Sequence, residues 1–398
     1  MTAIRRGALI ALLVVALVAT SLVVVVRSPE PSTARMRGIN VATLLTQAVT
    51  IYDHPEDTRT GEPPLSYERL QQLGHRVIRL PVDWSYLQPG LGSGDESFHP
   101  AYWAAIRTEV ARIKAAGMRV VLGLHNGCEW RAPRATTAPL VCGAGLTPAQ
   151  TNQVWRKLSD GFRDEPAVAA YDLFNEPTRF SHPTRADLQS ADKPAYAVYQ
   201  RHVNEVVRTL RAAGDRTVLW VESLCCSRFS DFAYTDPNGG WVEDPLRRVV
   251  YSQHMYPVRN SGVGEVFDPA KLDPGYVRDQ GRSWVDLGYE RGFLGRLRMF
   301  GDWCARSEVE CSVGEVGWYG PGQSAASAEQ WNRLGDRWYA LANRYGMDVT
   351  YFGTSSAFHG PLWAYDAPGP DVWLPAAGLS RKQSQAAIIE KPEHLSQG

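Results

Sequence analysis

Two glutamates lie in or directly after apolar segments and could do acid–base chemistry together. Glu176 stands in Asn175-Glu176-Pro177, directly after the apolar stretch 170–174, and Glu315 lies in the run 312–316. A carboxylate at an apolar strand end is costly unless it has a use. Two carboxyl groups that face one cavity at about 5 to 5.5 Å can cleave an acetal with retention, and a wider gap favours inversion. The two glutamates are therefore candidates for a catalytic pair.

Four further polar side chains stand at the ends of other apolar segments, where substrate contacts are expected. They are Arg79, His125, His254 and Tyr256. Each residue also has a purely structural interpretation, because an arginine can form an ion pair and a histidine or tyrosine can be satisfied inside a core. The side chains become interesting only if the fold brings them to one place.

The elements that must position these residues are eight short apolar runs. They alternate with segments whose apolar residues recur every three or four positions, which is typical of α/β proteins. Gly74, Gly117, Gly214 and Gly346 follow four predicted helices, where a left-handed residue would end the helix. The predicted strands are 37–41, 76–81, 119–124, 170–174, 217–223, 249–255, 312–316 and 348–352.

Eight strand–helix units predict a single closed (β/α)8 barrel, the TIM barrel, in which the carboxyl ends of the strands carry the active site. A doubly wound open sheet is the alternative, but no G-x-G-x-x-G follows the first strand. The stretches 227–248 and 258–290 are long and rich in Gly, Pro and Asp, so we expect them to be loops on the active face.

The order of these polar residues along the chain resembles glycoside hydrolase family 5, the cellulase family, within the clan of retaining barrel glycosidases. The resemblance covers residues 36 to about 380 and rests on Arg79, His125, Asn175-Glu176-Pro177, His254 with Tyr256, and Glu315. It implies that Glu176 is the acid/base and Glu315 the nucleophile. It also implies that Asn175 binds the sugar 2-hydroxyl and that the two histidines bind substrate and support the carboxylates.

The local sequence supports these two roles. Leu173 and Phe174 are apolar neighbours of Glu176, and an apolar setting would raise the pKa of a general acid. Arg79 and Tyr256 match the family positions that would lower the pKa of Glu315 and keep it ionised.

The eighth strand departs from the family, which usually presents a tryptophan there as the floor of the sugar site. Here the strand reads Tyr351-Phe352-Gly353. Phe352, or Trp363 from the following loop, is the expected substitute. Trp130, in an insertion between Cys128 and Cys142, and Trp318 are further candidates for stacking on sugar rings.

The N-terminus predicts export. Arg5 and Arg6 precede an uncharged apolar segment over 8–26, which is typical of a signal peptide or a membrane anchor. We expect a signal or anchor at 1–27, a linker at 28–35 and the catalytic domain at 36–398. The catalytic domain would then be extracytoplasmic, either secreted or anchored through 8–26.

Charge and cysteine usage limit the partners. The chain has 42 Lys+Arg and 42 Asp+Glu, which argues against nucleic-acid binding. Six cysteines in an exported chain favour disulfides, with local pairs Cys128–Cys142 and Cys304–Cys311, while Cys225 and Cys226 stay unexplained. No ligand cluster or phosphate-binding loop predicts a metal or a cofactor. We expect a monomer with a carbohydrate substrate and membrane contact only through an uncleaved anchor.

The default function is that of an endo-β-1,4-glucanase. The same residues serve β-mannanases, β-1,3-glucanases and enzymes that cleave glycolipids or cell-envelope glycans. A catalytically idle carbohydrate-binding barrel is the alternative class, although it would not need both glutamates.

Overall fold

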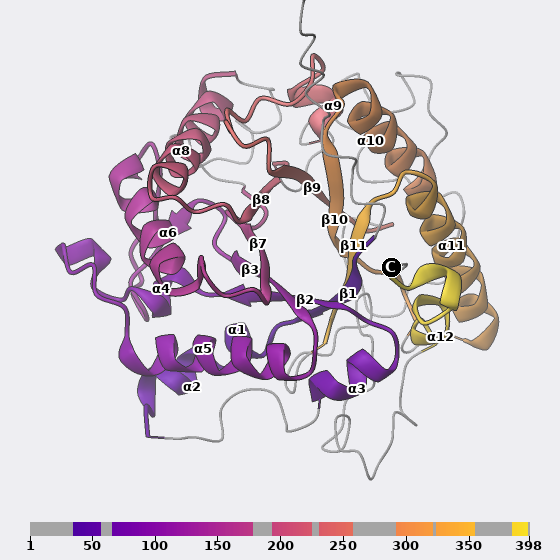
Figure 1. Ribbon diagram of the computed structural model, residues 1–398, viewed down its shortest axis with the longest axis horizontal. Coiled ribbons are helices and arrows are strands. Elements are labelled where there is room, and N and C mark those ends of the chain that lie inside the picture. Colours follow the sequence, from indigo (N-terminus) through magenta and orange to yellow (C-terminus); the bar gives the residue numbers. More distant parts are fainter. Residues whose placement is uncertain are drawn as a thin grey trace, which may run out of the picture. The chain divides into compact units, whose positions relative to one another are not determined.

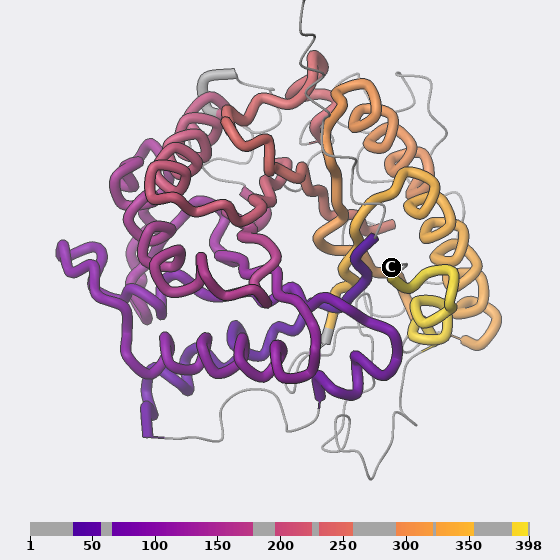
Figure 2. Tube along the Cα trace, in the orientation of Figure 1, coloured from indigo at the N-terminus to yellow at the C-terminus, as the bar shows by residue number. Residues whose placement is uncertain are grey.

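A closed barrel of parallel strands forms the centre of the described chain. The computed structural model describes residues 35–56, 66–177, 193–224, 231–257, 292–320, 324–354 and 384–396. Around the barrel the strand order is β1-β11-β10-β9-β8-β7-β3-β2, and β1 pairs with both β2 and β11. In Figure 2 the indigo segment at the start of the described chain, which contains β1, lies beside the orange segment that contains β11. The strands are β1 Arg37–Val41, β2 Val77–Val82, β3 Arg119–Leu124, β7 Val168–Asp172, β8 Val218–Glu222, β9 Val249–Met255, β10 Glu310–Val316 and β11 Asp348–Thr354.

The predicted barrel is confirmed, and the alternative open sheet is wrong. All eight predicted strands occur, with ends that differ from the prediction by two residues or fewer. The longer helices surround the strands (Figure 1). Four glycines predicted to end helices do have positive φ, for example 71° at Gly117 and 66° at Gly346. The helices are α1 Thr43–Thr46, α2 Ala48–Asp53, α3 Ser66–Gln72, α4 Trp84–Leu87, η1 Leu91–Ser93, α5 Pro100–Ala115, α6 Pro148–Phe162, α8 Lys193–Ala212, α9 Phe232–Thr235, α10 Phe293–Ser307, α11 Ala325–Arg344, α12 Ala386–Ile389 and η4 Pro392–His394.

The barrel interior changes from apolar to charged over two residues along three of the strands, β2, β7 and β8. A small apolar cluster is formed by Val77, Val121, Ala170, Trp220 and Val250. Because strand side chains alternate between faces, the residues two positions further on face the same interior. Those residues are Arg79, Gly123, Asp172, Glu222 and Ser252. The pleat therefore places buried charges directly above an apolar floor, at the carboxyl ends of the strands.

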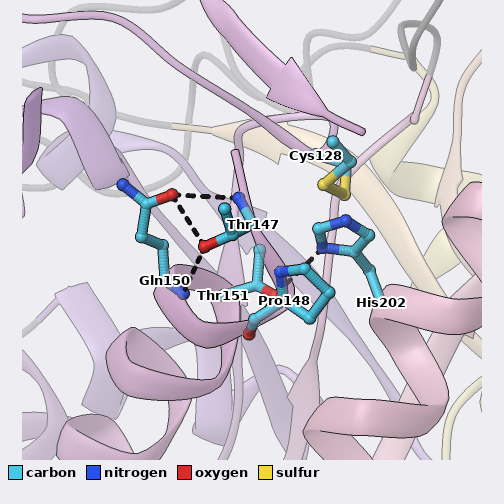
Figure 3. Close-up of a disulfide and its surroundings, with 7 residues drawn as sticks. Cys128, Thr147, Pro148, Gln150, Thr151 and His202 are labelled. Carbon is cyan, nitrogen blue, oxygen red and sulfur yellow. Dashed lines mark hydrogen bonds between the residues drawn. A yellow bond between two sulfur atoms is a disulfide. The ribbon is translucent and has the colours of Figure 1, made fainter. Parts of the chain in front are cut away.

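The insertion after β3 is a small disulfide-linked sheet. It consists of β4 Glu129–Trp130, β5 Leu140–Cys142 and β6 Gly145–Leu146. The Cys128–Cys142 disulfide lies beside His202 of α8, whose Nδ1 is 3.1 Å from Oγ1 of Thr151 (Figure 3). The predicted pair Cys304–Cys311 is also present. Cys225 and Cys226 lie outside the described residues.

Several predicted features lie outside the described residues. They are the apolar segment 8–26, most of the linker, the stretch 258–290, and Trp363. The described part of 227–248 contains the short helix α9. Within the described ranges, no helix has both the length and the hydropathy needed to cross a membrane.

Candidate active site

Arg79 joins three carboxylates in the middle of the barrel. Its side chain comes from β2 and is fully buried. Nε donates to Oδ2 of Asp172 at 2.8 Å, Nη2 donates to Oε1 of Glu222 at 2.9 Å, and Nη1 donates to Oε1 of Glu315 at 2.8 Å. These carboxylates come from β7, β8 and β10. One guanidinium therefore connects four strands of the barrel.

Two amide side chains complete the coordination of Arg79. Nη1 donates to Oδ1 of Asn40 at 2.9 Å, and Nη2 donates to Oδ1 of Asn175 at 2.7 Å. Asn40 is fixed in turn, because its Nδ2 donates to the backbone oxygen of Gly314 at 2.9 Å. The Asn175 carbonyl oxygen is thus occupied by Arg79, which leaves its NH2 group as the part that can reach a ligand.

Glu176 has an uncommon backbone conformation. Its φ is +44°, in the left-handed region, although it precedes Pro177 and carries a side chain. Its backbone N donates to Oε2 of Glu222 at 2.7 Å. The segment also packs closely on Gly127, where an added Cβ would lie 2.8 Å from the Glu176 carbonyl oxygen. Tertiary contacts therefore hold a conformation that the local sequence does not favour.

His254, near the end of β9, lies among three carboxylates. Its Nδ1 is 2.9 Å from Oε1 of Glu176 and 3.3 Å from Oε2 of Glu315. On the other side of the ring, Nε2 is 3.0 Å from Oε1 of Glu222 in an ion pair rather than an aligned hydrogen bond. Burial acts to lower the pKa of His254, but Glu222 and Glu315 outweigh it and raise the pKa well above its ordinary value. These neighbours therefore favour the protonated, imidazolium form of the ring.

The two predicted glutamates face one another. One carboxylate oxygen of Glu176 and one of Glu315 lie within 4.8 Å. The hydroxyl of Tyr256 donates to Oε2 of Glu315 at 2.8 Å. Glu315 is almost completely buried, whereas the side chain of Glu176 is 31% exposed. The pair therefore has one sheltered member and one member that solvent or a ligand can reach.

Negative groups outnumber positive groups in this cluster. Asp172, Glu222, Glu315 and Glu176 supply four carboxylates, while Arg79 and His254 supply two cations. Burial and then Glu222 raise the pKa of Asp172 to about 7, against the effect of Arg79. Since buried carboxylates that share a site cannot all ionise cheaply, Asp172 keeps a proton below about pH 7.

The pKa values of the two glutamates are shifted in the directions opposite to those expected. Burial acts to raise the pKa of Glu176, but the hydrogen bond and charge of His254 outweigh it and lower the pKa. Burial raises the pKa of Glu315, although His254 and Arg79 oppose it. The apolar neighbours Leu173 and Phe174 do not decide the matter, because His254 contacts Glu176 directly.

His125, directly after β3, is neutral. Burial, and then the charge of Arg79, lower its pKa to about 3. Its backbone N donates to the carbonyl oxygen of Val82, and its Nδ1 is a buried atom without a hydrogen-bond partner in the described structure. A neutral imidazole with an unused ring nitrogen is suited to a hydrogen bond with a ligand hydroxyl.

The aromatic candidates differ in where they lie. The expectation for Trp318 is wrong, because its ring is fully buried against α11 and its Nε1 donates to Oδ1 of Asn332. Trp130 is 4% exposed, and its Nε1 donates to the backbone oxygen of Gln88. Phe352 is 8% exposed and stands level with Asn40 in the ladder between β1 and β11, so it faces the same interior.

The side chains of Glu176, His254 and Glu315 also resemble a set of metal ligands. Their ligand atoms all lie within 4.8 Å of one another. A protonated imidazole has no lone pair to offer, however, and Glu315 already accepts from Arg79 and Tyr256. In this arrangement the positive charge between the two glutamates is supplied by the His254 ring itself, where a metal site would have a metal ion.

Sequence reasoning missed three members of the cluster, namely Asn40, Asp172 and Glu222. Asp172 and Glu222 are the last residues of β7 and β8. A usable signal was present, since each carboxylate stands two residues after an inward-facing apolar residue, Ala170 or Trp220, in a strand that is otherwise buried.

A closed (β/α)8 barrel with paired carboxylates at the ends of its strands is an enzyme architecture. The chain belongs to the family described as cellulase, glycosyl hydrolase family 5, whose sequence profile matches residues 66–357. It is thus a glycoside hydrolase. A search of curated proteins found no match.

Solved structures with the same fold include several endoglucanases. The chain resembles the endoglucanase Cel5A of Pseudomonas stutzeri in complex with cellobiose, with a TM-score of 0.62, 17% identity, and coverage of 90% of this chain and 92% of that one. An endo-β-1,4-glucanase of Xanthomonas axonopodis pv. citri matches with a TM-score of 0.61 and 16% identity, over 90% of this chain and 99% of that one. A broad-specificity endoglucanase from Bacteroides salanitronis matches with a TM-score of 0.60 and 16% identity, over 83% of this chain and 87% of that one. At these identities the likeness supports the fold.

Proposed function

We propose that this protein is a retaining β-glycosidase in which Glu176 is the acid/base and Glu315 the nucleophile. The observation that carries the proposal is that carboxylate oxygens of the two residues lie within 4.8 Å. Retaining enzymes place these groups about 5 to 5.5 Å apart, whereas inverting enzymes need roughly 6.5 to 9.5 Å to admit a water molecule.

In the first half-reaction Glu315 attacks the anomeric carbon while Glu176 protonates the departing oxygen. Arg79 and Tyr256 hold the two oxygens of Glu315 and so orient it for attack. Glu176 needs a proton for this step, and Nδ1 of His254, 2.9 Å away, is the nearest donor. Transfer of that proton turns an ion pair into two neutral groups, which exclusion of water by the substrate favours.

In the second half-reaction Glu176 acts as the base. Formation of the glycosyl ester removes the charge of Glu315, so His254 is left with fewer anionic neighbours. Glu176, once it has given its proton to the leaving group, accepts a proton from an incoming water, which attacks the anomeric carbon. The net result is hydrolysis with two inversions at the anomeric carbon. Glu176 then holds a proton again and returns it to Nδ1 of His254, 2.9 Å away, which restores the starting ion pair.

The remaining residues would bind the sugar. The free NH2 group of Asn175 suits the 2-hydroxyl, a contact that strengthens in the transition state. His125 and Phe352 would contact the same sugar, and Trp363 is proposed to cover it from the following loop. We propose a β-1,4-glucan as the substrate, because the solved relatives named above are endoglucanases. The two disulfides support an extracytoplasmic site of action.

The test is release of reducing sugar by the purified protein from β-1,4-glucan, β-1,3-glucan, mannan, xylan, glycolipid and envelope glycans. Glu176→Ala should lower the rate on the cleaved substrate by about 10² to 10⁴, and Glu315→Ala should abolish it. Glu310→Ala is the matched control, because Glu310 is an exposed glutamate at the opposite end of β10. NMR should show the β-anomer as the first product. Initial formation of the α-anomer, or binding without cleavage of any glycan, would contradict the proposal.

A further inference from the structure

Glu222 makes three polar contacts with the groups that surround the catalytic pair. Its Oε2 accepts from the backbone N of Glu176 at 2.7 Å, and its Oε1 accepts from Nη2 of Arg79 at 2.9 Å. The same Oε1 lies 3.0 Å from Nε2 of His254. The residue is 2% exposed and stands at the end of β8. Like Asp172, it is an acidic residue that sequence reasoning left without a role.

The contact with the Glu176 backbone bears on where the acid/base points. A non-glycine residue with φ of +44° before a proline persists only where its surroundings fix it. The 2.7 Å hydrogen bond to a carboxylate is charge-assisted and therefore strong. If this bond is lost, the peptide between Asn175 and Glu176 keeps only its packing on Gly127 and the bond from the Asn175 backbone N to the Leu124 oxygen. The Glu176 side chain is then held less firmly in its direction.

The contact with His254 bears on which ring nitrogen keeps its proton. Glu222 faces Nε2, while Glu176 and Glu315 face Nδ1. When Nδ1 gives its proton to Glu176, the neutral ring must carry its remaining proton on Nε2, and a carboxylate beside Nε2 stabilises that tautomer. The charged or titratable groups that act on His254, Glu176 or Glu222 come from several elements: Arg79 from β2, His125 after β3, Asp172 from β7, Glu315 from β10 and Tyr256 after β9.

We propose that Glu222 is a positioning residue for the acid/base, which fixes the backbone of Glu176 and the Nε2–H tautomer of His254 at the same time. The expected effect on catalysis rests on the proposed function, in which Glu176 is the acid/base. The hydrogen bond to the Glu176 backbone and the tautomer of His254 do not depend on that function. Glu222 itself is 2% exposed, whereas the Glu176 side chain is 31% exposed, so Glu222 is not expected to touch the substrate.

Asp172 offers a matched control, because it is also a buried carboxylate that accepts from Arg79. No hydrogen bond or ion pair is described between Asp172 and Glu176 or His254. Asp172 does share a side-chain hydrogen bond with Glu222, and the charge of His254 acts on it from a distance. If Glu222 serves only as a counter-ion for Arg79, Glu222→Gln and Asp172→Asn should have the same pattern of effects. If it positions the acid/base, only Glu222→Gln should affect the step that needs proton donation.

The kinetic test compares aryl β-glycosides of the sugar that the enzyme cleaves. A phenyl leaving group needs protonation and a dinitrophenyl leaving group needs little. Glu222→Gln should lower kcat/KM by about 10² for the phenyl glycoside, the size expected from a misplacement of about 1 Å, and by only a few-fold for the dinitrophenyl glycoside. Asp172→Asn should lower both by the same factor. An equal loss on both substrates for Glu222→Gln would overturn the proposal.

A second measurement does not depend on activity or on a variant that folds. In wild-type protein with ¹⁵N-labelled histidine, Nε2 of His254 should stay protonated throughout a pH titration, and Nδ1 should be the nitrogen that loses its proton. The backbone amide proton of Glu176 should resonate far downfield, as expected for a short bond to a carboxylate. Loss of the Nε2 proton first, or an ordinary Glu176 amide shift, would overturn the proposal. If the wild-type protein cleaves no glycan, the proposed function is contradicted. The NMR measurement still tests the role of Glu222, because it needs no activity.

Discussion

Replacing Asp172 by Asn should change how the stability of the protein depends on pH. The pKa of Asp172 is raised from 3.8 to about 7, first by burial and then by Glu222, with Arg79 opposing. The folded protein therefore keeps a proton that the unfolded chain releases near pH 4. For a carboxyl with a raised pKa, the contribution to stability is complete below the unfolded value and is lost as the pH rises through the folded value, here from about pH 4 to about pH 7.

The size of the effect follows from the two pKa values. The difference between 3.8 and about 7 corresponds to roughly 4 kcal/mol, at about 1.4 kcal/mol per pH unit. Asn has the shape of the protonated carboxyl and keeps an oxygen that can accept from Nε of Arg79. It does not titrate. The free energy of unfolding of the variant, relative to wild type, should therefore rise by roughly 4 kcal/mol between pH 4 and pH 8.

Urea unfolding followed by tryptophan fluorescence at pH 4, 6 and 8, with the disulfides intact, measures this difference. Asp160→Asn, which changes an exposed aspartate on α6, is the control and should run parallel to wild type. If the free energy of unfolding of Asp172→Asn changes with pH as that of wild type does, Asp172 is ionised throughout this range. That result would refute the view that the cluster has too few cations for all four of its carboxylates to be ionised.

Two other changes test the packing around the site. Gly314→Ala would place a Cβ 2.9 Å from Oγ of Ser252 and 3.1 Å from Nε2 of His254; we expect kcat to fall by about 10² with the thermal midpoint little changed, and an unaffected kcat would show that His254 tolerates displacement. Replacing Cys128 and Cys142 together by Ser removes a disulfide that spans 14 residues and should lower the free energy of unfolding by about 3 kcal/mol in urea, whereas equal stability would mean that the small sheet is held without it.

The sequence predicted the barrel because its strands are buried on both faces and stand out as apolar runs between amphipathic helices. The strand ends were less certain. The apolar run 170–174 continues through Leu173 and Phe174, but β7 ends at Asp172. The run extends past the strand because Leu173 and Phe174 are buried in the core although they lie beyond the strand. The exact phase of the pleat therefore decides that Asp172 and not Leu173 faces the barrel interior.

The polar residues Arg79, Asn175, Glu176, His254, Tyr256 and Glu315 do lie together, but their electrostatics could not be predicted from neighbours in the chain. Glu176 has a lowered pKa because of His254, which is 78 residues away. Glu222 escaped notice for the same reason, since its partners Arg79 and Glu176 lie on other elements. Trp318 was misjudged because nearness to Glu315 in sequence does not say which side of the barrel a ring faces.

The coordination of Arg79 has a consequence for how the protein acquires its activity. Its partners come from β1, β7, β8 and β10 as well as from the segment after β7, and β1 completes the barrel only by pairing with β11. Asn40 of β1, one of these partners, also donates through Nδ2 to the backbone oxygens of Thr350 and Tyr351 in β11. The first described strand must therefore pair with the last described strand before Arg79 has its full set of partners in place. A nascent or truncated chain that lacks β11 should have no assembled centre, so recovery of activity from two separately expressed fragments would report ring closure itself.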